Sequence, residues 1–456
     1  MNRTKEQLVA LQEEINKLGG RKKYIESEIK RRGIVVEKRV SMKSFTDDKR
    51  KEEYITNRKI EEDIRSELRS LTWEAYKTEN ISYLGEGIFW KDSLGVDFFD
   101  PYERSVRRAD NDVPEIETIE DLVKALQEAV PDLDVPKLRW FCFHRDVAEV
   151  VHYETFAIPK KSGGKRYISA PLPQLKSLQN WILRNILERM PIHEAAHGFI
   201  EGRSIVTNAA VHTNSQFVLS MDLKDFFPTL TFRRVKGIFR AMGYLEGIAT
   251  IFALICTESP RQPICLQDDQ TGEKKWVHVA VGPRCLPQGS PASPMLTNLA
   301  SMRLDRRLTG FACKHGLRYT RYADDLTFSA PMGTDHKKEW LESVVTDIVE
   351  GEGFQVHPEK TKMMGTGNRQ EVTGLVVNDT IAPRVPKTVK EKLRAAIHNQ
   401  EQGKAFYEDE SLDTFLGYAS FIYSAQPTIG QKYLDRTLEL MKNMNAILEN
   451  LEEKES

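Results

Sequence analysis

The chain has 456 residues, of which 40% are hydrophobic and 29% charged, a composition that indicates a soluble globular protein with a sizeable core. It contains no run of about 18 apolar residues, no apolar signal-peptide segment and no CxxC spacing among its cysteines. We therefore expect no membrane span, zinc site or disulfide framework, and a reducing cytoplasm. The net charge of -1 weighs mildly against a nucleic-acid partner.

The first part of the chain, to about residue 75, is expected to be helical. Apolar residues recur there at helical spacing, namely Leu8, Leu11, Ile15, Leu18, Ile60, Ile64, Leu68 and Leu71. Breaks are expected at Gly19-Gly20 and at Ser44–Asp48. Residues 1–60 hold 17 Lys and Arg against 10 Asp and Glu, a local net charge of +7. We expect a packed helical extension over residues 1–115, and its role in gripping RNA or docking a partner stays open.

The segments that follow lead into a hairpin with a basic tip. Residues 80–112 are expected to be irregular and residues 119–130 to form a short helix. Phe156–Ser169 predicts two strands joined at Gly163-Gly164, which suits a tight turn. Basic residues flank this turn, among them Lys160, Lys165 and Arg166. Arg166 suits bidentate contact with phosphate, although such a hairpin taken alone is more often merely solvated.

Acidic residues stand at the ends of predicted strands. Phe217–Asp222 indicates a buried strand that ends in an acid, and Leu317–Ser329 indicates a hairpin with Asp324-Asp325 at its turn. A lone Asp-Asp is most often a solvated turn. Two acidic strand ends in this order instead favour a site for two Mg²⁺ ions, which prefer oxygen ligands and serve phosphoryl transfer. The carbonyl of Leu223 offers a further oxygen.

These segments resemble the motifs of reverse transcriptases. Tyr322–Asp325, Tyr-Ala-Asp-Asp, is similar to the central palm motif, and Asp222 with Phe226-Phe227 is similar to the first. Leu286–Pro294 resembles the motif beneath the incoming nucleotide and the template. The resemblance covers residues 153–424. It implies an RNA-directed DNA polymerase whose catalytic carboxylates are Asp222, Asp324 and Asp325.

The same resemblance implies the architecture and the ion site. The fold is expected to be an α+β right-hand polymerase, with fingers and palm over residues 116–385 and a helical thumb over residues 386–456. The N-terminal helical extension would precede them. Two Mg²⁺ ions are expected on four residues: Asp222, Leu223, Asp324 and Asp325.

Other residues receive roles in handling dNTPs. Phe227 would close off the sugar 2′ position and exclude ribonucleotides, although most phenylalanines simply pack in a core. Gln288-Gly289 would let the backbone approach the nucleotide closely, and Lys160, Lys165 and Arg166 would contact the triphosphate. Lys360 in Gly353–Lys362 would protonate the pyrophosphate, with Lys362 as the alternative.

Two further segments resemble hallmarks of retron reverse transcriptases. Asn208 and His212 belong to an Asn-Ala-x-x-His motif, and Val372, Thr373 and Gly374 form Val-Thr-Gly. In that family these segments are tied to recognition of the cognate RNA and its priming guanosine. Tyr418 lies in a segment that resembles the thumb helix packed against the template–primer duplex.

The retron resemblance implies an unusual product and several partners. The primer would be a guanosine 2′-hydroxyl within a structured non-coding RNA, and the product a branched RNA–DNA (msDNA). An anti-phage role with a separate effector protein is expected. Since we find no RNase H-like domain after the thumb, host RNase H would remove the template.

Two alternatives stay open at this point. One is another bacterial reverse transcriptase, either defence-associated or group II intron-like, although maturase and endonuclease regions are missing. The other is a non-catalytic RNA scaffold on a polymerase fold, and the intact set of three aspartates argues against it.

Overall fold

The structure is a computed structural model of the chain. It describes residues 14, 17–18, 21–31, 47–78, 81–83, 89–91, 104–142, 146–159, 163–267, 274–333, 338–378, 381–404, 406 and 411–455. Within these residues no helix is long and apolar enough to cross a membrane.

The described residues up to residue 78 are mostly helical, as predicted for the chain to about residue 75. They contain α2 (Arg21–Arg31) and α3 (Asp48–Thr78), and Ile29 and Ile64 are buried. The predicted apolar positions Leu8, Leu11 and Ile15 and the break at Gly19-Gly20 lie outside the described residues.

The expectation that residues 80–112 are irregular is wrong in part. Strands β1 (Ile81–Tyr83) and β2 (Phe89–Lys91) pair in an antiparallel manner, and α4 (Arg104–Asp110) follows. Both strands are rich in β-branched and aromatic residues, which favour extended backbone even between glycines. Helix α4 is attached to the fingers, because Arg107 Nη1 donates to the carbonyl of Arg240 at 3.3 Å.

The fingers combine short helices with two strand assemblies. Helix α5 (Ile119–Leu126) confirms the helix predicted at 119–130, with a capping box formed by Thr118 and Asp121. The fingers further comprise α6 (Val135–Cys142), the β4–β5 hairpin (Tyr153–Pro159, Lys165–Pro171), α7 (Pro173–Asn185) and η2 (Leu187–Arg189). A second sheet has the order β3-β8-β7 (Val147–Ala148, Lys274–Ala280, Arg261–Gln267).

The palm is a four-stranded antiparallel sheet in the order β11-β6-β10-β9. Its strands are β6 (Ser215–Asp222), β9 (Arg318–Tyr322), β10 (Asp325–Pro331) and β11 (Lys362–Gly365). The sheet has two buried faces, because side chains alternate along each strand. Phe217, Leu219 and Met221 face the main hydrophobic core, whereas Val218 faces a second one.

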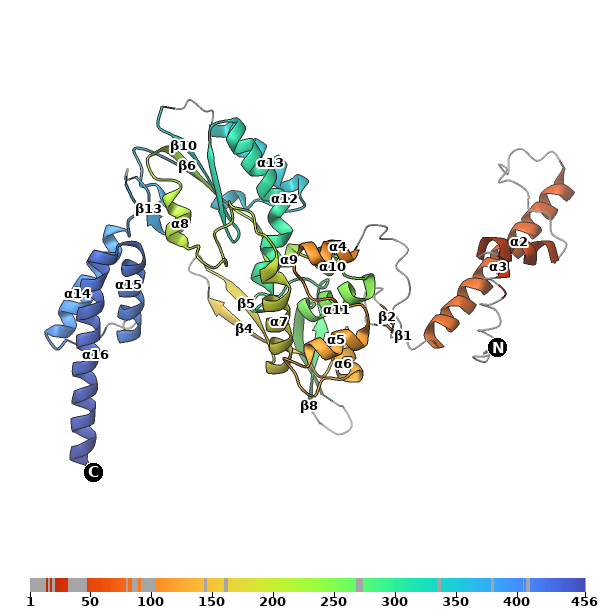
Figure 1. Ribbon diagram of the computed structural model, residues 1–456, viewed down its shortest axis with the longest axis horizontal. Coiled ribbons are helices and arrows are strands. Elements are labelled where there is room, and N and C mark those ends of the chain that lie inside the picture. Colours follow the sequence, from red (N-terminus) through yellow and green to blue (C-terminus); the bar gives the residue numbers. More distant parts are fainter. Residues whose placement is uncertain are drawn as a thin grey trace.

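Helices enclose the palm on its main-core side. Helix α12 (Ser293–Lys314) packs along β9 and against α13 (Lys338–Gly351) (Figure 1). The connections carry α9 (Phe226–Thr229), α10 (Phe232–Ala241), α11 (Glu246–Cys256) and η3 (Pro358–Lys360). The largely apolar α11 is buried along most of its length, which places it inside the fingers core.

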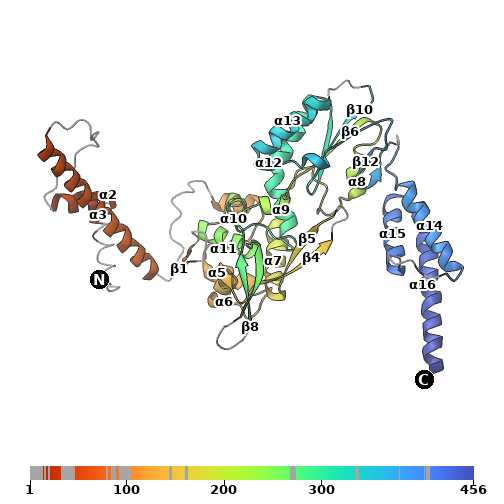
Figure 2. The ribbon, with the colours of Figure 1, turned by 180° about the vertical axis from the view of Figure 1, so that it is seen from behind.

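The second core joins the palm to the thumb. Helix α8 (Ile205–Ala210) lies beside the hairpin of β12 (Glu371–Val372) and β13 (Leu375–Val376), as seen from behind in Figure 2. The thumb follows as α14 (Lys387–Glu401), α15 (Leu412–Ala425) and α16 (Pro427–Glu455). Strand β6 thus contributes residues to both the main hydrophobic core and the second one.

Candidate active site

The palm sheet brings the predicted carboxylates to one edge. Asp325, at the start of β10, is the register partner of Asp222, at the end of β6, so their side chains lie on the same face. Asp324 lies in the tight turn between β9 and β10, and its carbonyl accepts a hydrogen bond from the Leu223 amide at 2.9 Å. Strand pairing therefore fixes residues about a hundred positions apart in sequence.

Burial and neighbouring negative charge raise the pKa values of two of these carboxyl groups. Burial, together with the charges of Asp324 and Asp222, raises the pKa of Asp325 to about 7. Burial and Asp222 also raise the pKa of Asp324, while Lys360 and Arg166 oppose this shift. Three acids that disfavour one another's charge are the environment in which a divalent ion is a strong partner.

Lys360 supplies a positive charge to this site. Its ammonium donates to both carboxylate oxygens of Asp222, at 2.6 and 2.8 Å. The pairing depends on a bridge between Leu223 and Val356 and on the His357 amide, which donates to the carbonyl of Asp222 at 2.8 Å. Lys360 was expected at the pyrophosphate, and in the structure its ammonium is paired with the carboxylate of Asp222.

The acidic residues offer the oxygen ligands that Mg²⁺ prefers, so their chemistry fits the predicted ions. Among the described residues, no group of three or more His, Cys, Asp and Glu side chains is already arranged to hold a metal. The carboxylate of Asp222 is instead paired with the ammonium of Lys360, which supplies the positive charge next to it. An ion at this carboxylate would replace the lysine as its partner.

The finger hairpin is fastened to the loop that contains Gln288 and Gly289. The amide of Ser169 on β5 donates to the carbonyl of Gln288 at 2.7 Å. Gly289 has a φ of +122°, and a Cβ there would lie 2.7 Å from the carbonyl oxygen of Ser169. Only glycine permits this approach. The strand that carries Lys165 and Arg166 therefore contacts the loop that carries Gln288 and Gly289.

The basic hairpin residues are exposed where the structure describes them. Lys165 and Arg166 on β5 are exposed to solvent. The positive charge of Arg166 opposes the rise in the pKa of Asp324. Gly163 and Gly164 both have positive φ, as the predicted turn requires. Lys160 lies outside the described residues.

Phe227 follows the first palm motif on α9. Phe226 is buried, whereas Phe227 is half-buried and packs against the edge of the main core. The rings of Phe226 and Phe227 meet edge to face, with centroids 5.9 Å apart. The partial exposure of Phe227 leaves ring surface available to a nucleotide.

Sequence reasoning missed Gln179 on α7. Its buried amide donates to the Tyr153 hydroxyl and to the carbonyl of Ile255, both at 2.8 Å, and accepts from Ser290 Oγ at 2.9 Å. It thus connects the base of the finger hairpin with the residue after Gly289. In the sequence Gln179 is a polar residue in a segment with several apolar neighbours, which is weak evidence by itself.

The two segments that resembled retron hallmarks are adjacent in space. The side-chain amide of Asn208 on α8 donates to Thr373 Oγ1 at 3.5 Å, and Thr373 Oγ1 donates to the carbonyl of Ile205 at 3.1 Å. Thr373 and Gly374 both have positive φ in the turn between β12 and β13. We call this contact between α8 and the turn the α8–turn joint. Val372 is buried behind it.

His212 lies inside the molecule rather than on its surface. Its Nδ1 is 2.8 Å from Ser329 Oγ and its Nε2 is 2.7 Å from Thr320 Oγ1, so both nitrogens are engaged by palm strands. Burial lowers the pKa of His212 to about 3. His212 and Asn208 are fully buried, so any effect of these two side chains on RNA must pass through the residues that they hold. Tyr418 on α15, by contrast, is 46% exposed.

Comparison with known proteins agrees with this geometry. The family model for reverse transcriptase (RNA-dependent DNA polymerase) matches residues 158–390, which include the palm sheet and the second strand of the finger hairpin. The α+β polymerase fold expected from the sequence is thereby confirmed. The boundaries at 115/116 and 385/386 stay predictions.

Similar proteins give a narrower family. The retron Mx162 reverse transcriptase of Myxococcus xanthus is 42% identical over 97% of this chain and 91% of its own length. The retron Mx65 enzyme of the same organism is 41% identical over 69% of this chain and 70% of its own length. The retron Ec86 enzyme of Escherichia coli is 33% identical over 71% and 89%, respectively. The chain therefore belongs to the retron reverse transcriptases and is an RNA-directed DNA polymerase.

Proposed function

We propose that the enzyme copies part of a cognate structured non-coding RNA, starting from the 2′-hydroxyl of a guanosine in that RNA. The product would be a branched RNA–DNA, msDNA. The observation that carries the proposal is the α8–turn joint, where Asn208 meets Thr373. It lies on the face of the palm sheet that carries Asp222 and Asp325, because Val218 on that face packs in the same core. RNA held at the joint would thus approach the carboxylates from their own side.

Asp222, Asp324, Asp325 and the carbonyl of Leu223 would hold two Mg²⁺ ions. When bound, the ions supply activation of the attacking hydroxyl and neutralise charge on the departing pyrophosphate. Lys360, released from Asp222, carries a proton that it can give to the pyrophosphate. Its side chain is 53% exposed, which leaves it room to move.

The fingers and palm would hold the dNTP. Arg166 and Lys165 would contact the triphosphate, with Lys160 from the hairpin tip. Gln288 and Gly289 would approach the nucleotide with their backbone, since the fingers are fastened there. The ring of Phe227 would occupy the space that a ribose 2′-hydroxyl needs. The exposed Tyr418 would face the template–primer duplex, where aromatic and polar contacts follow the shape of RNA.

Replacing a catalytic carboxylate tests the proposed ion site. We expect Asp324→Asn to abolish DNA synthesis at any Mg²⁺ concentration, because an amide oxygen is a much weaker ligand for a hard cation. RNA binding should persist, since the side chain lies in a turn rather than in the core. Primer extension and RNA gel shifts measure the two properties. Asp347→Asn, at an exposed position on α13, is the matched control, and normal synthesis by Asp324→Asn would remove the ion assignment.

The priming proposal is tested by isolating the complex from its host and sequencing both nucleic-acid strands. A single folded RNA joined to DNA through a 2′,5′ bond is the expected result. Heterogeneous RNA, or DNA without a branch, would contradict dedicated priming while leaving the polymerase activity intact.

We further propose partners beyond the RNA and the dNTPs. A separate effector protein would use the branched product in anti-phage defence, and host RNase H would trim the template. A reducing cytoplasm is the proposed compartment, and the five free cysteines fit it.

A further inference from the structure

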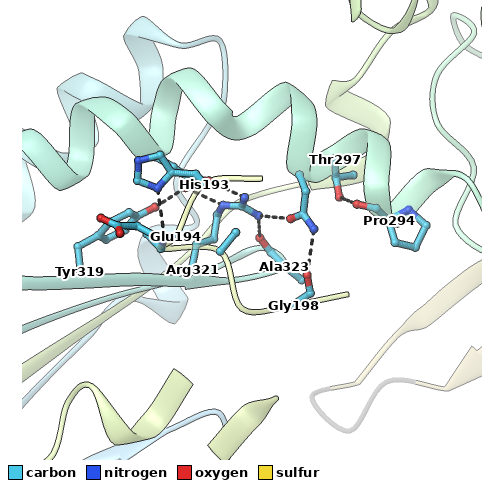
Figure 3. A network of polar contacts seen from close by, with 12 residues as sticks. His193, Glu194, Gly198, Pro294, Thr297, Tyr319, Arg321 and Ala323 are labelled. Atoms are coloured by element: carbon cyan, nitrogen blue, oxygen red, sulfur yellow. Dashed lines mark hydrogen bonds and ion pairs between the residues drawn. The ribbon is translucent and has the colours of Figure 1, made fainter. Parts of the chain in front are cut away.

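A buried ion pair lies directly beneath the catalytic turn. Arg321 on β9, which is labelled in Figure 3, donates to Asp305 on α12 through Nε at 2.8 Å and through Nη2 at 2.7 Å. Both side chains are fully buried. The hydroxyl of Tyr319 adds a third hydrogen bond to Asp305 at 2.8 Å. Burying two charges costs desolvation free energy, which is offset only when the pair has good geometry and makes all its hydrogen bonds. A specific structural role would explain why the pair is buried here.

The remaining bonds of Arg321 lead to the catalytic turn. Its Nη1 donates to the carbonyl of Ala323 and to Oδ1 of Asn298, both at 3.0 Å. Ala323 precedes Asp324 and has a φ of +54°. The left-handed region is unfavourable for alanine, so it persists only where the surroundings enforce it. The hydrogen bond from Arg321 therefore fixes the carbonyl of Ala323, the residue in the left-handed conformation.

The same turn is also confined by Gly198. A Cβ at Gly198 would lie 2.7 Å from the backbone nitrogen of Ala323. The carbonyl of Gly198 accepts from the side-chain amide of Asn298 at 3.0 Å. The segment before Gly198 runs beside β9, where the amide of Arg321 donates to Ala195 and the amide of His197 donates to Arg321, each at 2.7 Å. The turn is thus held by the hydrogen bond from Arg321 to the carbonyl of Ala323 and by the close approach of the Gly198 backbone.

These groups act on the catalytic aspartates without touching them. Arg321 and Tyr319 lie on the helix side of β9, since Tyr319 belongs to the main core. Asp325 and Asp222 point to the other face, because Asp325 pairs with Tyr322 and Leu326 pairs with Arg321. The hydrogen bond from Arg321 to the carbonyl of Ala323 links the helix side of β9 to the turn that carries Asp324.

We propose that Arg321, Asp305 and Asn298 form a positioning clamp. The clamp holds Ala323 in its left-handed conformation and so sets where Asp324 and Asp325 present their carboxylates. Its direct role is preorganisation of the ion-binding edge. The inference rests on the aspartates' role under the proposed function, and Asp324→Asn tests that role separately.

The first test removes clamp bonds while keeping buried charge balanced. Arg321→Lys keeps the charge but loses the planar fork, and Asn298→Ala removes the link between Arg321 and Gly198. In each variant kcat should fall roughly tenfold to a hundredfold, as expected for misplaced catalytic groups. The Mg²⁺ concentration for half-maximal activity should rise, while the KM for dNTP and RNA affinity should stay near wild type.

The control is Ser301→Ala. Ser301 is buried on the same helix face as Asn298 and Asp305, and its hydroxyl has no hydrogen-bond partner among the described residues. Its removal should leave kcat and the Mg²⁺ requirement unchanged. An equal loss in Ser301→Ala and Asn298→Ala would mean that α12 merely tolerates no substitution, and would overturn the clamp.

A second variant and a rescue keep the proposal testable if Arg321→Lys folds poorly. Gly198→Ala leaves the ion pair intact but pushes on the nitrogen of Ala323, so it should lower kcat and raise the Mg²⁺ requirement in the same way. Ala323→Gly should partly restore activity to Asn298→Ala, because glycine adopts positive φ without support. If Gly198→Ala and Asn298→Ala keep wild-type kcat, or Ala323→Gly restores nothing, the positioning role is wrong.

Discussion

His212 has its ring beneath the palm and both nitrogens bonded to strand hydroxyls. In the fold it is neutral at pH 7, because burial lowers its pKa to about 3. In the unfolded chain its pKa returns to about 6.5. Between these values the unfolded chain binds a proton that the folded chain does not, so stability falls as the pH falls.

We expect the free energy of unfolding to decrease by up to roughly 1.4 kcal/mol per pH unit from this residue as the pH falls below about 6.5. His212→Gln removes the titrating group and should flatten that part of the profile, although it lowers stability at pH 7. Denaturant unfolding from pH 7 to pH 4 measures the slope. His398→Gln, at an exposed position on α14, should keep it, and identical slopes in wild type and His212→Gln would contradict the buried neutral ring.

Phe227 is the residue on which sugar selection is expected to depend. Phe227→Ala should raise ribonucleotide incorporation relative to deoxyribonucleotide incorporation by roughly tenfold or more, because it opens space for the 2′-hydroxyl. Competition between the matched rNTP and dNTP in primer extension gives the ratio. The half-buried ring makes a small stability loss expected as well. An unchanged ratio would leave Phe227 with a packing role only.

At the scale of single residues, the sequence predicted types of side chain better than their partners. Asp222, Asp324 and Asp325 are predicted as site residues because strand patterns end at them, and the strand register brings Asp222 and Asp325 together. The pairing of Lys360 with Asp222 depends on how a later bridge is registered against β6. Asp305 looks like an ordinary helix charge in Leu304-Asp-Arg-Arg, and only the fold reveals that it is buried against Arg321.

The β4–β5 hairpin is fixed to the loop at Gly289, because backbone atoms of the two segments are in contact. Gly289→Ala would place a Cβ 2.7 Å from the carbonyl oxygen of Ser169, at a backbone angle that alanine resists. We expect the hairpin to be displaced and the KM for dNTP to rise about tenfold, equivalent to about 1.4 kcal/mol of binding. Steady-state extension at varied dNTP concentration measures it.

Gly310→Ala is the matched control for that substitution. Gly310 lies in α12, and a Cβ there would meet nothing within 4 Å. Alanine should slightly stabilise the helix and leave the KM unchanged. A similar rise in KM for both variants would contradict the role given to the contact between Ser169 and Gly289.

Whole elements were predicted where their patterns are long and regular. The palm strands, the finger hairpin and the helix at Ile119 follow from alternation, glycine turns and capping. Strands β1 and β2 were missed, because each has only three residues among glycines. The β7–β8 hairpin gave a weak signal as well, since Pro263 lies inside its first strand.

The molecule as a whole has two apolar cores that share the palm sheet. The main core runs from Val113 to Phe354, and the second runs from Ala209 to Leu440 and includes the thumb. The thumb helices pack tightly at Gly430, where a Cβ would lie 2.1 Å from Tyr423 Cα. The thumb can therefore be damaged without disturbing the main core.

Gly430→Ala should separate the start of α16 from the end of α15. We expect the apparent Tm to fall by several degrees. Processive synthesis should also fail, because under the proposed function the thumb holds the duplex. Addition of a single nucleotide should persist, since the carboxylates lie in the palm. Gly417→Ala on α15, where a Cβ would meet nothing within 4 Å, is the control. Equal loss of single additions and long products would contradict a separate thumb.

The α8–turn joint has a consequence for chimeric enzymes. Asn208 and Thr373 are far apart in sequence, yet each supplies half of one polar contact. Exchanging Val372–Gly374 alone with a related enzyme would pair a foreign turn with the resident helix. A transplant of RNA preference should therefore succeed only when Ile205–Ala210 and the turn are moved together, as two parts of one cassette.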